Sequence, residues 1–193
     1  MNPELVLAST SPYRKALLER LGIPFRARAP LCDEDALKRP GVTPQELAEL
    51  LAEAKARSLT AEEPNAVILG GDQVATIDGK ILGKPGSFER ALEQLELMNG
   101  RTHELITAIY LWKANQAYAH TDITRLTMRK LSSALLKRYL KADEPYDCAG
   151  SFKLEQRGIT LFENIESADH TAITGVPMIA LTSMLMKLGF EIP

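Results

Sequence analysis

The sequence predicts an α/β fold, in which short buried strands alternate with amphipathic helices. Two short apolar runs, at 5–8 and 66–71, are typical of strands, and the second is continuous enough to be buried on both faces. A helix pattern with start and stop signals follows the first run, and Asp78-Gly79 indicates a tight hairpin after the second. With 193 residues, 45% of them hydrophobic, the chain is long enough for one domain with a substantial core.

The first helix is predicted to begin at Pro12. Ser11 is a good N-cap, Pro12 lacks the N–H that would be unpaired at the first helical position, and Gly22 suits the position just past the end. A strand that leads into a helix N-terminus presents unpaired N–H groups and a partial positive charge, which attract phosphate. Ser9 and Ser11 add hydroxyl groups and Arg14 adds a full charge. The turn is therefore either an ordinary strand–helix connection or a phosphate site.

The next segment combines an acidic turn with a second helix. Three consecutive carboxylates, at 33–35, follow a short strand expected within 23–29, and they are either a solvated loop or oxygen ligands for a divalent metal. A capping box that starts at Thr43 places a helix N-terminus there. The apolar residues expected to face inward are Leu47, Leu50, Leu51 and Ala54. Lys55 then lies at the flank of that face, where it extends either to water or to a site.

Asp72 follows the apolar run at 66–71 and is therefore predicted at the carboxyl end of a buried strand. Open α/β sheets gather their ligands at such ends, and the two glycines before Asp72 allow a close approach. Because the Asp78-Gly79 hairpin folds the chain back, we expect Lys84 to lie close to Asp72.

The rest of the chain continues the alternation. We expect a helix capped by Ser87, followed by strands at 105–112 and 118–128. A further helix is expected to start at Ser132 or Ser133 and to bury Leu135, Leu136 and Tyr139. A last helix is expected after Gly175-Val176-Pro177. The segment 146–160 is interrupted by glycines and charges and is interpreted as a functional loop. The polar segment 165–174 is expected to be exposed.

Composition excludes several classes of function. The net charge is −2 and the sequence has no dense run of Lys and Arg, so we expect no nucleic-acid partner. No apolar run approaches the 18 or so residues that cross a membrane, and no signal-peptide pattern opens the sequence. Two cysteines make no disulfide framework. We therefore expect a cytoplasmic protein with no membrane partner.

The chemistry that these residues favour is that of a hard cation and phosphate. Glu34 and Asp72 supply the carboxylate oxygens that magnesium or manganese prefers. Lys55, Lys84 and Arg14 supply positive charge to neutralise a polyphosphate. A bound metal would orient and activate water and stabilise charge on the phosphoryl group.

A series of short motifs resembles the Maf family of nucleotide pyrophosphatases, essentially from end to end. The motifs are Leu7-Ala8-Ser9-Thr10-Ser11-Pro12 with Arg14, Asp33-Glu34, Ala54-Lys55-Ala56, Gly71-Asp72-Gln73, Gly83-Lys84-Pro85, Asn99-Gly100-Arg101-Thr102-His103, Ala149-Gly150-Ser151-Phe152 and Gly175-Val176-Pro177. One such tripeptide is weak evidence, whereas the whole series in order is strong.

The resemblance implies a Maf/ITPase-like fold: a mixed, twisted sheet flanked by helices, with two lobes around a central cleft, as one domain over 1–193. It implies hydrolysis of a nucleoside triphosphate to the monophosphate and pyrophosphate with a divalent cation (Mg or Mn), and a homodimer. Under it, Asp72 is the general base or the metal's anchor, Glu34 is a metal ligand, and Lys55 and Lys84 contact phosphate. Ser9, Ser11 and Arg14 are expected to bind substrate.

Three positions suggest a subgroup with a particular base preference. Tyr13, Gln73 and Glu155 together resemble the 7-methyl-GTP pyrophosphatases of the family. An aromatic ring attracts a cationic base such as N7-methylguanine, and a carboxylate accepts hydrogen bonds from the guanine edge. Ala108 and Gln156 stand where the family usually has glycine, and the second departure bears on the loop that presents Glu155. The alternatives are the commoner dTTP/UTP pyrophosphatase and a nucleotide-sensing regulator of cell division without turnover.

Overall fold

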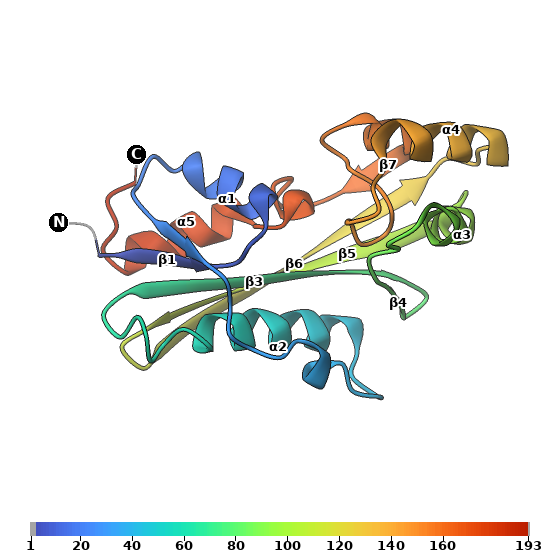
Figure 1. The fold of residues 1–193 in the computed structure, drawn as a ribbon. Coiled ribbons are helices and arrows are strands. Elements are labelled where there is room, and N and C mark those ends of the chain that lie inside the picture. The colour runs from blue at the N-terminus through green and yellow to red at the C-terminus, as the bar shows by residue number, and fades with distance from the viewer. Residues whose placement is uncertain (1–2, 193) are drawn as a thin grey trace. The chain divides into compact units, whose positions relative to one another are not determined.

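A computed structural model of the chain, which describes residues 3–192, contains a mixed seven-stranded sheet. Its order is β2-β1-β3-β5-β6-β7, and the short β4 pairs with β3 (Figure 1). β1 pairs in parallel with β2 and β3, whereas β3–β4 and β6–β7 are antiparallel. The strands are β1 (Leu5–Ala8), β2 (Arg26–Arg28), β3 (Val67–Ile77), β4 (Lys80–Leu82), β5 (Thr102–Lys113), β6 (Gln116–Met128) and β7 (Phe162–Glu166).

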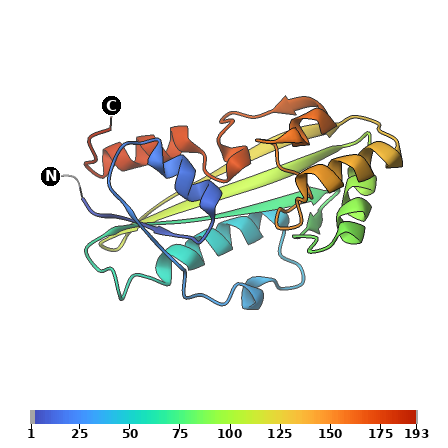
Figure 2. The ribbon, with the colours of Figure 1, turned by 45° about the horizontal axis from the view of Figure 1, so that its top comes forward.

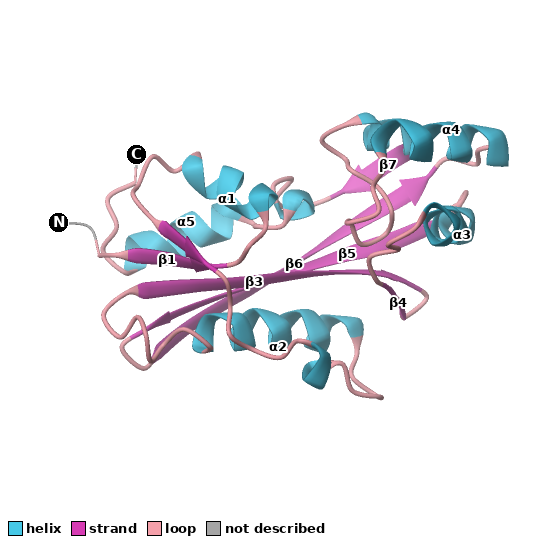
Figure 3. Ribbon diagram, in the orientation of Figure 1, coloured by secondary structure: helices cyan, strands magenta, loops and turns pink. Residues whose placement is uncertain are grey.

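Most of the helices, which Figure 3 shows in cyan, begin directly after the capping residue that the sequence predicts. They are α1 (Pro12–Glu19), α2 (Pro44–Arg57), α3 (Phe88–Met98), α4 (Ser133–Asp143) and α5 (Met178–Lys187). Ser11, Thr43, Ser87 and Ser132 each accept a hydrogen bond from a backbone N–H in the first turn, and the capping box at Thr43 is complete. Within residues 3–192, no helix is both long and apolar enough to span a membrane.

The chain divides into two compact units. The first contains the part up to Asp72, Thr107–Asp122 and the part from Asp169, and the second contains Gln73–Ile106 and Ile123–Ala168. β3, β5 and β6 contribute residues to both units. The α/β class and the mixed sheet with helices are thus confirmed. One domain over 1–193 and a cleft between its lobes remain predictions.

In the first unit, helices cover both faces of β1 and β3. Figures 1 and 2 show α1 and α5 together on one face and α2 on the other. Leu5, Leu7, Val67 and Leu69 point to the α1–α5 side and form its core with Leu17, Leu18, Leu181 and Leu185. Since side chains alternate along a strand, the even-numbered positions of β3 within this unit, from Ile68 to Asp72, face α2.

α2 packs so closely on β3 that one strand position requires glycine. A Cβ at Gly70 would lie 2.1 Å from the Ala52 carbonyl oxygen and 2.6 Å from the Ala56 nitrogen. Alanines therefore stand at this contact, and the residues of α2 that are buried are Leu47, Ala48, Leu51, Ala52, Lys55 and Ala56. The prediction that Leu50 faces inward is wrong, since it is 42% exposed, and Lys55 is central to the buried face.

Two further expectations about burial are wrong. Leu135 is 39% exposed because α4 turns Leu136 and Tyr139 inward instead. The segment 165–174 is not exposed throughout, because Asp169 and Thr171 are buried beneath the start of α5. Pro177, at the N-cap, makes no side-chain cap, and the side chains of Asp169 and Thr171 accept the N–H groups of that first turn instead.

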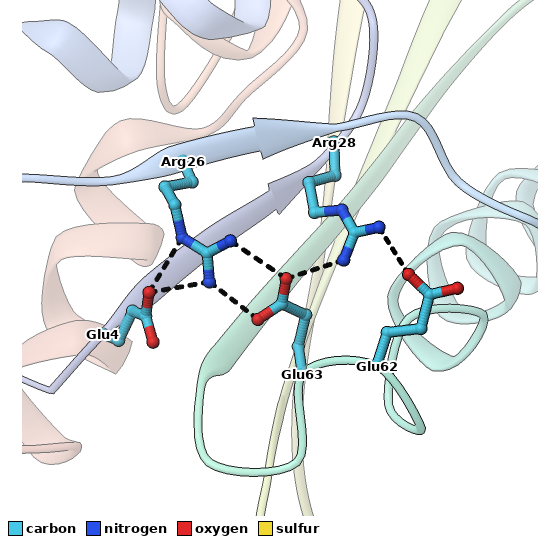
Figure 4. Close-up of polar contacts among 5 residues, drawn as sticks. All are labelled: Glu4, Arg26, Arg28, Glu62 and Glu63. Atoms are coloured by element: carbon cyan, nitrogen blue, oxygen red, sulfur yellow. Dashed lines mark hydrogen bonds and ion pairs between the residues drawn. The ribbon is translucent and has the colours of Figure 1, made fainter.

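An ion network fixes the edge strand β2 (Figure 4). Glu63 accepts from Arg26 Nη2 at 2.7 Å and from Arg28 Nη1 at 2.8 Å, and Glu4 and Glu62 extend the network at its two ends. Hydrogen bonds from Arg26 and then Arg28 hold the pKa of Glu63 below its usual value. The network joins the start of β1 and the segment before β3 to the edge of the sheet.

Candidate active site

Two carboxylates converge on one lysine in the first unit. Lys55 Nζ lies 2.6 Å from Asp72 Oδ1 and 3.0 Å from Glu34 Oε2. Lys55 and Asp72 are only 6% and 9% exposed, whereas Glu34 is half-buried. The sequence predicted all three as site residues, and the structure brings them together. The trio carries one net negative charge, and its carboxylates are the groups that would meet a cation.

Asp72 is not at the end of its own strand, as the sequence suggested. β3 continues to Ile77, so Asp72 lies in its middle. It lies instead just beyond the end of the neighbouring strand, because β1 stops at Ala8, opposite Gly70. From Gly71 onward this edge of β3 has no paired β1 residue. The carboxyl end of β1, rather than that of β3, therefore defines the site.

Arg14 reaches the same edge of β3 from the first turn of α1. Its Nε donates to the Gly175 carbonyl oxygen at 3.1 Å, and its Nη1 contacts Ser9 Oγ at 3.5 Å. Burial lowers the pKa of the guanidinium, and the charges of Asp72 and Glu34 oppose that shift. A cation with reduced hydration is thereby held near the two carboxylates, and its N–H groups suit charge-assisted hydrogen bonds to a phosphate.

The predicted hydroxyl groups shape the turn that carries Arg14. Ser9 Oγ accepts from the Ser11 backbone N–H at 3.1 Å, and Ser11 Oγ accepts from the Arg14 N–H at 3.4 Å. Ser9 is 7% exposed, and Ser11 is half-buried. In the structure both hydroxyls bond to the protein itself, so their contact with substrate stays a prediction.

The second unit carries the other predicted lysine. Lys84 is exposed and follows β4, whose pairing through Leu82 and Ala75 confirms the hairpin. Gln94, which sequence reasoning missed, donates to the Gly83 carbonyl oxygen at 2.9 Å and accepts from Ser151 Oγ at 2.6 Å. It thus ties the Lys84 loop to the segment 149–152. No spacing rule marks Gln94, because the contact joins residues far apart in sequence.

The predicted base-reading residues are divided between the units. Tyr13 is half-buried on α1 in the first unit. Gln73 follows Asp72 on β3 and is half-buried, whereas Glu155 is exposed, and both belong to the second unit. That the three side chains meet around one base remains a prediction.

The donor set for a metal is small. Across residues 3–192, no group of three or more His, Cys, Asp and Glu side chains is arranged to hold a metal ion. Magnesium, however, is commonly held by one or two carboxylates together with water and substrate phosphates. Glu34 and Asp72 both form ion pairs with the Lys55 ammonium group, and this pair of carboxylates fits that mode of magnesium binding.

Comparison with known proteins gives the family of this chain. Residues 4–188 match the model of the family described as Maf-like protein, and the chain belongs to this family.

Its relatives are similar over nearly their whole length. A 7-methyl-GTP pyrophosphatase of Bdellovibrio bacteriovorus is 50% identical over 182 residues, which is 94% of this chain and 95% of that protein. Proteins of the same name from Xanthomonas axonopodis pv. citri and Pseudomonas syringae pv. tomato are 48% and 46% identical, each over 99% of this chain and 100% of the relative. A solved dITP/XTP pyrophosphatase from Mycobacterium abscessus is 14% identical, with a TM-score of 0.43 over 97% of this chain and 98% of that one.

Proposed function

We propose that this chain is a nucleoside triphosphate pyrophosphatase that hydrolyses 7-methyl-GTP to 7-methyl-GMP and pyrophosphate. The observation that carries the proposal is the convergence of Glu34 and Asp72 on Lys55, beside Arg14. The names of relatives that are 46–50% identical over nearly the full chain support the substrate. Removal of the modified nucleotide from the nucleotide pool is the corresponding role.

In the proposed reaction, a water oxygen forms a bond to the α-phosphorus while the bond from that phosphorus to the bridging oxygen breaks. Pyrophosphate leaves with the bridging oxygen. Asp72 accepts the water proton, and Lys55, 2.6 Å away, orients the carboxylate for that transfer. Arg14 donates to phosphate oxygens and offsets the charge that develops there.

Glu34 and Asp72 would hold the divalent cation, Mg or Mn. When bound, the cation supplies a Lewis acid that lowers the pKa of water and neutralises phosphate charge. Lys84 is assigned to phosphate binding, and it is exposed on a loop that Gln94 anchors. Ser9 and Ser11 are assigned to substrate binding through the turn that they shape.

Base selection is assigned to Tyr13, Gln73 and Glu155. The positive charge of N7-methylguanine favours stacking on the Tyr13 ring, which contributes about 0.5–2 kcal/mol. The Glu155 carboxylate would accept charge-assisted hydrogen bonds from the guanine N1–H and amine. Replacing Tyr13 with Arg should therefore change selectivity more than rate.

We also propose a homodimer in the cytoplasm. Membership of the Maf family supports both statements, and the free thiols of Cys32 and Cys148 suit a reducing compartment.

The experiment that tests the function is release of pyrophosphate from a panel of nucleoside triphosphates with Mg²⁺ or Mn²⁺. We expect 7-methyl-GTP to be hydrolysed fastest. A preference for dTTP and UTP would instead show that the chain has the commoner dTTP/UTP pyrophosphatase activity of the Maf family. Tight nucleotide binding without turnover would favour a nucleotide sensor.

A further inference from the structure

A buried hydrogen-bonded path leads from Thr107, in β5, to the candidate phosphate-binding arginine. Thr107 is 1% exposed, and its Oγ1 donates to the Ala172 carbonyl oxygen at 2.9 Å. The same carbonyl oxygen accepts the Gly175 N–H at 2.9 Å. The Gly175 carbonyl oxygen then accepts from Arg14 Nε at 3.1 Å. All four residues belong to the first unit.

The conformation of Gly175 brings its backbone against the arginine. Its φ is +116°, a region that residues with a side chain rarely adopt. A Cβ there would lie 3.4 Å from both Cγ and Nε of Arg14. On the β3 side, a Cβ at Gly71 would lie 3.6 Å from Arg14 Nε. The arginine side chain is therefore enclosed between two glycines.

The segment that contains Ala172 and Gly175 is itself fixed at its other end. The Asp169 carboxylate accepts the N–H of Thr171 at 2.9 Å and that of Ile179 at 2.7 Å. Thr171 Oγ1 accepts the N–H of Met178 at 2.9 Å. These bonds cap α5 and anchor the segment, whereas Thr107 contacts it at the turn nearest to Arg14.

The contacts of Arg14 leave one edge of its guanidinium for a ligand. Nε is committed to Gly175, and Nη1 has only the long contact to Ser9. Within the described part of the chain, Nη2 donates to no protein atom. An arginine fixed through Nε presents its remaining N–H groups in a constant direction, which suits a phosphate oxygen.

We propose that Thr107 is a positioning residue for the nucleotide, acting through Ala172 and Gly175 to fix the orientation of the Arg14 guanidinium. The proposal rests on the proposed function in one respect, that Arg14 binds phosphate. It assigns a role in substrate binding to a buried hydroxyl that does not itself touch substrate.

The test is a double-mutant cycle on the KM for 7-methyl-GTP. Thr107→Val keeps the shape of the side chain but removes the hydroxyl, and we expect KM to rise about fivefold, the value of one ordinary hydrogen bond, while kcat changes less than about twofold. Thr107→Ser should restore the wild-type KM. In an Arg14→Ala background, Thr107→Val should cause no further rise, because residues that act through one another are not additive.

Thr124→Val is the matched control. Thr124 is also a 1% exposed threonine, and its Oγ1 contacts Ser167 Oγ at 3.0 Å, in the second unit. We expect a similar loss of thermal stability from both valine variants but an unchanged KM for Thr124→Val. An unchanged KM for Thr107→Val, or an equal rise with and without Arg14, would overturn the proposal.

A second readout does not depend on turnover. In protein with ¹⁵N-labelled arginine, the Nε–H signal of Arg14 is assigned by its loss in Arg14→Lys. In the wild type this proton should exchange slowly with water. In Thr107→Val its exchange rate should be at least about fivefold higher. If the wild type hydrolyses no nucleotide, the proposed function fails and this signal still decides the positioning role. Equal exchange rates in the two proteins would refute that role.

Discussion

His103 should make the stability of this protein strongly dependent on pH. The side chain, near the start of β5, is 1% exposed, and neither ring nitrogen has a hydrogen-bond partner within the described residues. Its ring lies against Phe152 and Phe162, with centroid distances of 5.5 and 5.6 Å. Because a charged imidazolium would be poorly solvated there, burial lowers the pKa of His103 to about 4.

The size of the effect follows from the gap between the folded and unfolded pKa values. An unfolded histidine has a pKa of about 6.5, so as the pH falls the unfolded chain takes up a proton before the folded chain does. The folded state thus loses stability from about pH 6.5 down to about pH 4. At about 1.36 kcal/mol per pH unit, the loss amounts to about 3 kcal/mol.

The assay is urea unfolding of wild type and His103→Leu at a series of pH values from 7 to 4. The difference in unfolding free energy between the two proteins should change by about 3 kcal/mol over this range, in the direction that favours the leucine variant at low pH. His170→Gln is the control, because His170 is exposed. Parallel curves for wild type and His103→Leu would refute the assignment of a depressed histidine pKa.

Three further predictions concern packing, the ion network and a thiol. Gly70→Ala should lower the unfolding free energy by about 1–3 kcal/mol or more, because its Cβ meets the α2 backbone, whereas Gly71→Ala meets only ordinary contacts and should be nearly neutral; equal urea midpoints would contradict this. Glu63→Gln should lower the melting temperature at pH 7 but much less at pH 3, since a carboxylate with a depressed pKa stabilises only above the pH at which it is protonated; calorimetry showing an equal shift at both pH values would exclude this role. Burial raises the pKa of Cys148 to about 12, so iodoacetamide should label it far more slowly at pH 8 than it labels free cysteine, and labelling at the free-cysteine rate would show the thiol to be accessible.

Local signals in the sequence were sufficient for the helix starts and for the membership of the charged cluster. Ser11 and Thr43 cap their helices because a hydroxyl before a helical run satisfies nearby N–H groups, whatever the rest of the fold does. Glu34, Lys55 and Asp72 were recognised from residue type and from family motifs, and the structure joins them.

What the sequence did not provide were properties set by contacts between distant segments. The buried face of α2 is set by the space above Gly70, which favours Ala52 and Ala56 at the contact over the larger Leu50. The position of Asp72 relative to a strand end is set by where β1 stops, not by β3. Polarity suggested exposure for Asp169, yet its carboxylate is buried because it accepts the N–H groups that begin α5.

The measurement that tests the account most directly is the turnover of 7-methyl-GTP by Asp72→Asn. The substitution keeps the shape of the side chain but removes the charge that Lys55 and a divalent cation would share. Asp78→Asn is the control, because Asp78 is exposed in the hairpin turn, where asparagine is equally suitable. We predict that Asp72→Asn lowers kcat at least about a hundredfold while Asp78→Asn leaves it unchanged. Near-normal turnover by Asp72→Asn would contradict the assignment of this cluster as the catalytic site.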